Sequence, residues 1–572
     1  SVDLQVKPWF KMGGSINGSW AVQDYGYSRT GQSSGSGPVD IYSAAKAIPR
    51  FGVPYDEEGN IITNPCGSTT NVYTVIDEWN KSTDNRQTFL ALGSFYGQFD
   101  FGKIWAPLEG LSYKISFGPD FRHYRQGIFI SKDSAVKMGS KNYAKYATDR
   151  YLSWTLDNQI NYNKTFGKHN LGVTLLQSAS KYNKESGSES ANAIPNENFE
   201  WYNMGSVDIT DAATYGAGMS TGMSENQLAS YMARINYAYN DRYLLTVSGR
   251  YDGSSKFPTD QQWAFFPSVS GGWRVSEEAF WKVNPDLFSN LKIRASYGSL
   301  GNGNVSPYSF LELLSISTSG RVLNGLKNKY TSAPAVMPDG LTWETATTTD
   351  VGLDFGMLNN RLQFNGDYYI RKTTDMYTVG ETLPDVFGAS SPKGNYADMT
   401  TKGWEITLTW RDQFTLAEKP FNYEIRGTLS DYISTIDRYN NQTGNLDDYY
   451  AGKRVGEIWG YVTEGLFKDQ ADIDSHADQT LIQSSSKRIT YPGDVKIKDL
   501  NGDHVIDYGN NTVDDHGDKT VIGNALPRYA YSINLSGDWN NFFLSAFFQG
   551  VGKQDWYPSS ECIFWGQYNR PY

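Results

Sequence analysis

Hydrophobic and polar residues alternate strictly over many stretches of the chain, and short turn sequences separate these stretches. In 231–252, apolar side chains occupy every second position from Tyr231 to Tyr239, Asn240-Asp241 interrupt the pattern, and the alternation resumes at Tyr243. A period of two residues is typical of a β-strand with one apolar face and one polar face. We therefore predict a β-hairpin whose apolar face packs against a second sheet or against lipid.

Runs of this kind predict about sixteen strands in about eight hairpins. The connections between them alternate in length. Short turns are predicted at 11–14, 163–168, 240–241, 358–361, 414–419 and 540–541. Long segments are predicted at 23–85, 121–147, 181–226, 301–343, 375–400 and 436–526. Short periplasmic turns and long extracellular loops are typical of outer-membrane proteins, so the pattern predicts an all-β fold, a transmembrane antiparallel β-barrel.

The composition agrees with strands that face lipid on one side. Tyrosine is frequent (40 residues), aromatic residues make up 15% of the chain, and only 39% of the residues are hydrophobic. No apolar run reaches the roughly 18 to 20 residues that a membrane-spanning helix needs. The main alternative is a large soluble β-protein such as a propeller or an array of sandwiches. A propeller would show a repeat of about 40 to 50 residues, and the sequence shows none.

Several stretches resemble one protein family over most of the chain. The clearest is YMARINYAYNDRYLLTVSGRYDGSSKFPTDQQWAFFPSVSGGWRVSEEAFW at 231–281. Others are LKIRASYGSLGN at 291–302, LTWETATTTDVGLDFGMLNNRLQFNGDYYIRKTTDMY at 341–377, NYADMTTKGWEITLTW at 395–410, GDVKIKDLNGDHVIDYG at 493–509 and DKTVIGNALPRYAYSINLSGDWNNFFLSAFFQG at 518–550. They resemble the SusC/RagA family of TonB-dependent outer-membrane transporters of Bacteroidetes.

The resemblance implies a barrel of about 22 strands around a plug domain. Since about sixteen strands are predicted here, we expect residues 1–572 to be a partial barrel domain. The N-terminal extension, the plug and the C-terminal closing strands would lie outside this sequence. A rival interpretation is that sixteen strands close alone as a passive porin or as another structural outer-membrane barrel.

The resemblance also implies partners and a function in the cell outer membrane. These are a SusD-like lipoprotein lid, TonB-ExbB-ExbD acting through the N-terminal part, outer-membrane lipid, and a dimer of SusC–SusD pairs. The imported substrate would be an oligosaccharide, with a peptide, as in the RagA type, as the alternative. The net charge of −11 argues against a nucleic-acid partner, which needs a basic surface.

One loop carries a motif that suits a calcium ion. Oxygen ligands at alternate positions of a tight loop are what Ca²⁺ requires. The predicted ligands are Asp499, Asn501, Asp503, the Val505 carbonyl, Asp507 and Asp518. His504 stands where glycine is usual and Asn510 where an acidic ligand is usual, so Asp518 is assigned the last position. The alternative is a hydrogen-bonded Asx-turn in a solvated loop.

Aromatic pairs in the long segments are candidates for contact with a sugar, because flat rings stack on sugar faces and hydroxyl groups bond to them. The alternative is that these rings pack loop against loop or seat a partner protein. The candidates are Trp201, Tyr202, Tyr449, Tyr450, Trp459 and Tyr461.

The remaining chemistry of the sequence points to structure. Polar-face cations of the strands are expected to line the barrel interior and to hold a plug. They are Arg234, Arg250, Lys292, Arg294, Arg371 and Arg426. No HExxH, nucleophile elbow or CxxC occurs, so no enzyme activity is predicted. Cys66 and Cys562 are the only cysteines, and we favour unpaired thiols over a disulfide.

Overall fold

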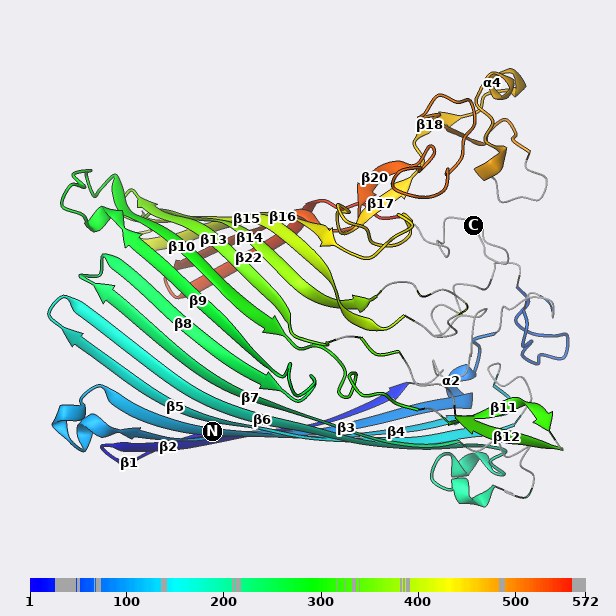
Figure 1. Ribbon diagram of the computed structural model, residues 1–572, viewed down its shortest axis with the longest axis horizontal. Coiled ribbons are helices and arrows are strands. Elements are labelled where there is room, and N and C mark those ends of the chain that lie inside the picture. The colour runs from blue at the N-terminus through cyan, green and yellow to red at the C-terminus, as the bar shows by residue number, and fades with distance from the viewer. Residues whose placement is uncertain are drawn as a thin grey trace. The chain divides into compact units, whose positions relative to one another are not determined.

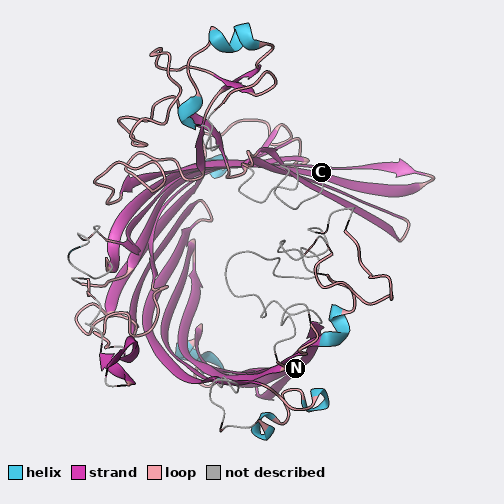
Figure 2. Cartoon of the chain, turned by 90° about the vertical axis from the view of Figure 1, so that its right-hand side faces the viewer, coloured by secondary structure: helices cyan, strands magenta, loops and turns pink. Residues whose placement is uncertain are grey.

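The computed structural model describes residues 1–25, 48, 52–65, 67, 74–134, 141–207, 210, 218–314, 316–323, 325–331, 336–338, 340–380, 383, 386, 391–482 and 489–557. Within these residues most of the chain forms β-strands, and helices are few (Figures 1 and 2). The main sheet has sixteen strands, and they follow one another in chain order across the sheet. The predicted all-β fold and strand count are therefore confirmed.

The strands of the main sheet are β1 (Val2–Lys7), β2 (Phe10–Tyr25), β3 (Ser82–Asp100), β4 (Leu111–Ile130), β5 (Tyr143–Phe166), β6 (His169–Asn192), β7 (Gly218–Tyr239), β8 (Tyr243–Ser254), β9 (Trp263–Arg274), β10 (Phe288–Asn302), β13 (Glu344–Met357), β14 (Leu362–Val379), β15 (Lys393–Leu416), β16 (Lys419–Arg438), β21 (Arg528–Trp539) and β22 (Phe542–Lys553). Shorter strands pair outside it: β11 (Ile316–Leu323) with β12 (Leu326–Thr331), β17 (Glu457–Gly460) with β20 (Thr520–Asn524), and β18 (Thr463–Leu466) with β19 (Val495–Ile497).

Helices are few and short. The α-helices in the described residues are α2 (Glu78–Lys81) and α4 (Gln470–Asp474). The 3₁₀ segments are η1 (Phe101–Lys103), η2 (Ala106–Leu108), η3 (Glu197–Phe199), η4 (Met204–Ser206), η5 (Val275–Glu277) and η7 (Thr480–Ile482). Among the residues that the structure describes, no helix is both long and apolar enough to cross a lipid bilayer.

The described chain divides into two compact units. The first contains residues 1–160 and 177–229, and the second contains residues 161–176 and 230–557. In the first unit, the register places Trp20 opposite Phe89 and Phe89 opposite His123. In the second, one row runs across four strands, with Trp410 opposite Ile425, Ile425 opposite Leu535 and Leu535 opposite Ala546.

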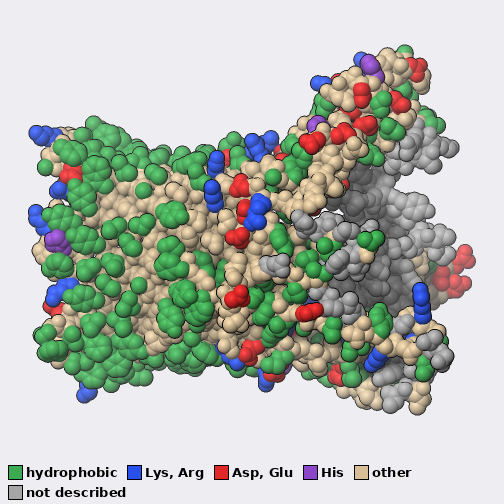
Figure 3. All heavy atoms as spheres, in the orientation of Figure 1, with side chains coloured by type: hydrophobic (Ala, Val, Ile, Leu, Met, Phe, Trp, Pro, Cys, Tyr) green, Lys and Arg blue, Asp and Glu red, His purple; other side chains and the backbone are tan. Residues whose placement is uncertain are grey.

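One face of the strands is apolar and exposed. Leu245, Val269, Ile293 and Val351 have 44, 42, 42 and 55% of their surface exposed. In Figure 3, hydrophobic side chains gather over the parts of the strands next to the short turns, and charged side chains are frequent beyond them. A continuous exposed apolar surface of this kind is suited to contact with hydrocarbon.

Most of the short turns lie where the alternation ends. Asn240, Asp241, Asn540 and Asn541 all have positive φ, as two-residue hairpin turns require. The turn predicted at 11–14 is wrong, because Pro8 and Trp9 form the turn and β2 already begins at Phe10. Gly13 and Gly14 stay within β2, since the rings of Tyr96 and Phe95 cover them and take the place of their missing side chains.

The connections on the other side are shorter than predicted, because the strands run further. The predicted segment 121–147 is reduced to 131–142 between β4 and β5. Strands β5, β6 and β15 each have 24 residues. At about 3.3 Å per residue such a strand measures about 80 Å, far more than an apolar band of about 25 Å. Beyond lipid both faces can be polar, so hydropathy does not show where these strands end.

Candidate functional site

The longest connection in the main sheet, residues 439–527 between β16 and β21, forms a structured body that we call the loop module. It contains the two small sheets β17–β20 and β18–β19 and helix α4 (Figure 1). Its 15 Asp and Glu and 8 Lys and Arg give a formal charge of −7, out of −11 for the chain. The predicted calcium loop and four of the six predicted aromatic residues all lie in this module.

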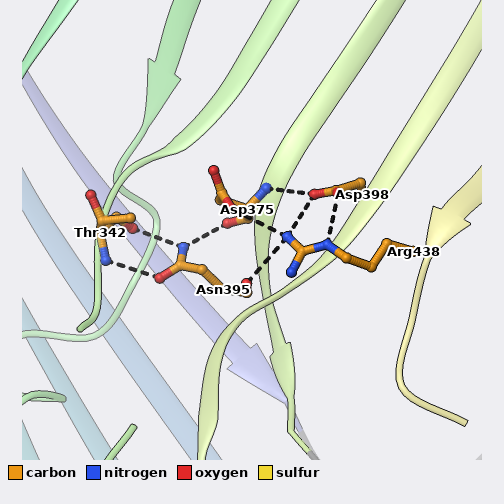
Figure 4. A network of polar contacts seen from close by, with 5 residues as sticks. All are labelled: Thr342, Asp375, Asn395, Asp398 and Arg438. Carbon is orange, nitrogen blue, oxygen red and sulfur yellow. Dashed lines mark hydrogen bonds and ion pairs between the residues drawn. The ribbon is translucent and has the colours of Figure 1, made fainter. Parts of the chain in front are cut away.

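An arginine at each stem holds the loop module to the main sheet. Arg438, the last residue of β16, donates from Nε and Nη2 to Asp398 over 2.7 and 2.8 Å, and from Nη2 to Asp375 over 3.1 Å (Figure 4). Arg528, the first residue of β21, donates to both oxygens of Asp431 over 2.6 and 2.5 Å. Charge-assisted bonds are about twice as strong as neutral ones, so both stems are fixed.

The network around Arg438 reaches a second long connection. The Asn395 side chain accepts from the Thr342 backbone N–H and donates to the Thr342 carbonyl, both over 2.9 Å (Figure 4). It also donates to the Asp375 carbonyl over 2.6 Å. Asp375 has a φ of 57° and its N–H donates to Asp398 over 2.9 Å. The chain before β13 and the ends of β14, β15 and β16 thus form one polar network.

Backbone pairing also anchors the loop module. The ladder between β16 and β21 stops at Ser430 opposite Ala530. Beyond it, residues 452–455 pair with β16: the Gly452 N–H donates to Ile436 over 2.8 Å, and the Val455 N–H donates to Ser434 over 2.9 Å. The loop module therefore continues the sheet at its base.

The predicted calcium loop is a nest of Asx-turns in this structure. Asp499 accepts from the N–H groups of Gly502 and His504 over 2.6 and 2.9 Å. These bonds, the one from Gly502 first, hold the pKa of Asp499 below its usual range. The N–H of Val505 donates to Asp503 over 2.8 Å. His504 takes the left-handed conformation, with a φ of 66°, that favours glycine at this position.

Asp518 closes the loop from the far side. Its side chain is fully buried and accepts from the N–H groups of Leu500 and Asp507 over 2.7 and 3.0 Å. Asp518 therefore contacts this loop through backbone N–H groups, and its role as a calcium ligand stays a prediction. In the described part of the chain no group of three or more His, Cys, Asp or Glu side chains is gathered to hold a metal ion, so a bound calcium stays a prediction.

Three of the predicted aromatics surround acidic groups of the loop module. The Tyr450 hydroxyl and the Trp459 indole N–H both donate to the Glu457 carboxylate, the latter over 2.9 Å. Burial first, then Glu457, raises the pKa of Tyr450 to about 12. Burial, with the charges of Asp507 and Asp518, raises the pKa of Tyr461 to about 12. The Tyr450 hydroxyl and the Trp459 N–H are therefore hydrogen-bonded within the loop module, and Tyr461 lies within the field of its carboxylates.

The other aromatic candidates differ in exposure. Tyr449 and Tyr202 are 47 and 71% exposed. Trp201 is only 5% exposed and packs in the first unit with a cluster that includes Phe129 and Ile194. Its ring covers Gly127 of β4. Trp201 therefore packs against other parts of the chain, which was the alternative to contact with a sugar. Contact of Tyr202 or Tyr449 with a substrate stays a prediction.

Three of the polar-face cations, Arg250, Lys292 and Arg294, pair with carboxylates of the same sheet. Arg294 donates to Asp354 over 2.9 and 2.8 Å and lies 2.8 Å from Asp367. Arg250 lies 2.7 Å from Asp252 and also donates to Ser230. Contact of these cations with a plug stays a prediction. Cys66 and Cys562 lie outside the described residues.

Sequence reasoning did not find the two stem arginines. The available signal was Asp431, which follows Ile425 and Leu429 on the apolar face of β16. A buried carboxylate on an apolar face is costly unless a cation pairs with it, and Arg528 is that cation.

Residues 19–571 match the sequence model of the family described as TonB dependent receptor-like, beta-barrel. The chain belongs to this family. Family members are outer-membrane proteins, so this chain is an outer-membrane barrel protein, and the family consists of receptors and transporters and not of enzymes. The family predicted from the sequence is confirmed.

The curated relatives of this chain that we compare are named as TonB-dependent receptors. TonB-dependent receptor P26 of Formosa agariphila is 28% identical over 97% of this chain and 53% of its own length. TonB-dependent receptor SusC of Bacteroides thetaiotaomicron is 32% identical over 41% of this chain and 23% of its own length. The RagAB peptide transporter shares the fold, with a TM-score of 0.73, 17% identity and coverage of 96% of this chain and 56% of its own. The chain spans about half the length of the curated relatives it matches.

Proposed function

We propose that this chain supplies the wall and the extracellular loop platform of an outer-membrane importer of oligosaccharides. The observation that carries the proposal is the loop module, an acidic body of defined fold that two arginine stems and a backbone ladder fix to a lipid-facing sheet. A passive pore has no need of such a platform. A platform suits a protein that captures a partner or a substrate above the membrane.

The partners in this proposal are those of the SusC type. A SusD-like lipoprotein would close over the long loops, and two such pairs would associate as a dimer. TonB-ExbB-ExbD would act on a plug domain inside the barrel and so open a path for the substrate. In the same proposal a calcium ion on Asp499, Asn501, Asp503, Val505, Asp507 and Asp518 would replace backbone N–H donors and stiffen the loop module.

A peptide importer is the second candidate. The observation that favours it is the likeness of the fold to the RagAB peptide transporter. Exposed tyrosine rings such as those of Tyr202 and Tyr449 favour the oligosaccharide, because flat rings stack on sugar faces.

Uptake by the full-length transporter separates these functions. A strain that lacks the gene is complemented with it and given a library of labelled oligosaccharides and peptides, with and without a protonophore. Oligosaccharide uptake that the protonophore abolishes supports the proposal. Peptide uptake alone supports the second candidate. Uptake that the protonophore leaves unchanged indicates a passive pore and overturns the energised mechanism. Co-purification of a lipoprotein tests the lid.

A further inference from the structure

The polar face of the last four strands carries a recess next to the short turns. It lies across β15, β16, β21 and β22 and has a volume of about 460 Å³. One cross-strand row contains Gln413, Asn422, Asp538 and Phe543. This face is opposite to the apolar face, and in a closed barrel it lines the interior.

The polar side chains of the recess fix one another. Arg411 donates to Glu424 over 2.5 Å, and Asn422 donates to Asp538 over 2.8 Å. Each group retains further donors or acceptors after these bonds, because a guanidinium has five N–H groups and a carboxylate accepts about four bonds. The floor of the recess therefore consists of amide, carboxylate and guanidinium groups whose positions are fixed by these hydrogen bonds.

Phe543 breaks the polar pattern of this face. Its row neighbours Asp538 and Asn422 are polar. Its side chain is 73% exposed, as is expected on β22, the last strand of the described sheet, where Phe542 on the other face is 72% exposed. Phe547 follows four residues later on the same face and is 60% exposed. At about 3.3 Å per residue the two rings stand about 13 Å apart along β22.

We infer that this recess is a saccharide subsite at the short-turn end of the barrel interior, and this inference rests on the proposed import of oligosaccharides. A sugar ring stacks on Phe543 while its hydroxyl groups bond to the Asn422–Asp538 and Arg411–Glu424 pairs. Phe547 receives the next part of the chain. Because the short turns are periplasmic, the subsite lies where an imported oligosaccharide leaves the barrel.

A protein segment packed in the recess is the competing occupant, and two substitutions of one residue separate the two. Stacking on a sugar needs a flat ring, whereas packing against protein needs only apolar volume. We compare Phe543→Leu with Phe543→Trp in the full-length transporter. Phe542 is the matched control, because it is 72% exposed on the opposite, apolar face of the same strand.

The probe is the labelled oligosaccharide that the wild-type transporter takes up best in the library experiment. We expect Phe543→Leu to weaken its binding to the purified transporter about tenfold, or about 1.4 kcal/mol. Phe543→Trp should keep the wild-type affinity, and Phe542→Leu should leave it unchanged. Heat-modifiable migration in gels confirms that each variant retains its folded barrel.

Other outcomes overturn the subsite. Equal affinity of Phe543→Leu and wild type, while wild-type uptake persists, refutes the subsite and leaves the proposed function standing. Unchanged affinity together with a raised ion conductance of Phe543→Leu in planar bilayers identifies a packed protein segment instead. Uptake of peptides alone by the wild type removes both the subsite and the oligosaccharide function.

Discussion

Arg528 and Asp431 form a bidentate ion pair between residues 97 positions apart in sequence, with N–O distances of 2.6 and 2.5 Å. Asp431 is 7% exposed and lies on the apolar face of β16. Arg528 begins β21, so the pair closes the C-terminal stem of the loop module at the sheet. Arg438 performs the same task at the N-terminal stem with a side chain that is 48% exposed.

The stem pairs predict unequal effects of substitution. Arg528→Gln leaves the buried Asp431 carboxylate without its cation, and we expect the loop module to lose about 2–4 kcal/mol of stability against opening. Arg438→Gln removes an exposed pair and should cost less than about 1 kcal/mol. Tryptic cleavage within 453–468, measured in purified protein, checks both. Equal cleavage rates of the two variants would show that burial of Asp431 does not matter.

Calcium should stiffen the loop module if the predicted site binds it. We expect added Ca²⁺ to slow proteolysis within 499–518 and to give a binding isotherm in calorimetry, since ion binding to the folded form stabilises it. Asp503→Asn should abolish both effects, because it removes a charged oxygen ligand. Asp514→Asn, outside the predicted ligand set, is the control. Identical behaviour of wild type with calcium and with a chelator would refute the site.

Acid should open the turn around Asp499. The pKa of this carboxyl is lowered in the folded protein by bonds from Gly502 and His504. Its stabilising contribution is therefore complete above the ordinary aspartate pKa of about 3.9 and is lost as the pH falls through the lower folded value. Hydrogen exchange of 500–504, corrected for intrinsic rates, should be constant near neutral pH and accelerate in strong acid. Asp499→Asn keeps one acceptor oxygen but cannot titrate, so we expect its exchange to be moderately faster at neutral pH and not to accelerate further in acid. Retention of acid sensitivity in this variant would assign the effect to another group.

The sequence alone predicts the strands that face lipid, because lipid imposes a strict period of two on their residues. Trp410, Ile425 and Leu535 follow that period and share one row. Strand ends beyond the lipid are not predictable in this way, and β5 and β6 extend past their apolar stretches.

The loop module shows a second limit of prediction. Its acidic motif was visible because Asp499, Asn501 and Asp503 are close in sequence. Asp518 lies further along the chain, and its contact with the Leu500 N–H comes from the fold of the loop module. The pairs Arg528–Asp431 and Phe543–Asp538 depend on which strands become neighbours, and local patterns do not contain that information.

Gly127 gives a test of the packing assigned to Trp201. A side chain on Gly127 would overlap the Trp201 ring, so we expect Gly127→Ala to destabilise the packing of 193–207 by about 1–3 kcal/mol. Gly187→Ala is the control, because the nearest atom to its new methyl group is Thr148 Oγ1 at 3.9 Å. Trp201→Ala should cost about 3–5 kcal/mol through the cavity it leaves. The rate of proteolysis within 193–207, measured in all three variants, ranks these losses of stability. If Gly127→Ala resists proteolysis as well as Gly187→Ala does, Trp201 does not lie on β4.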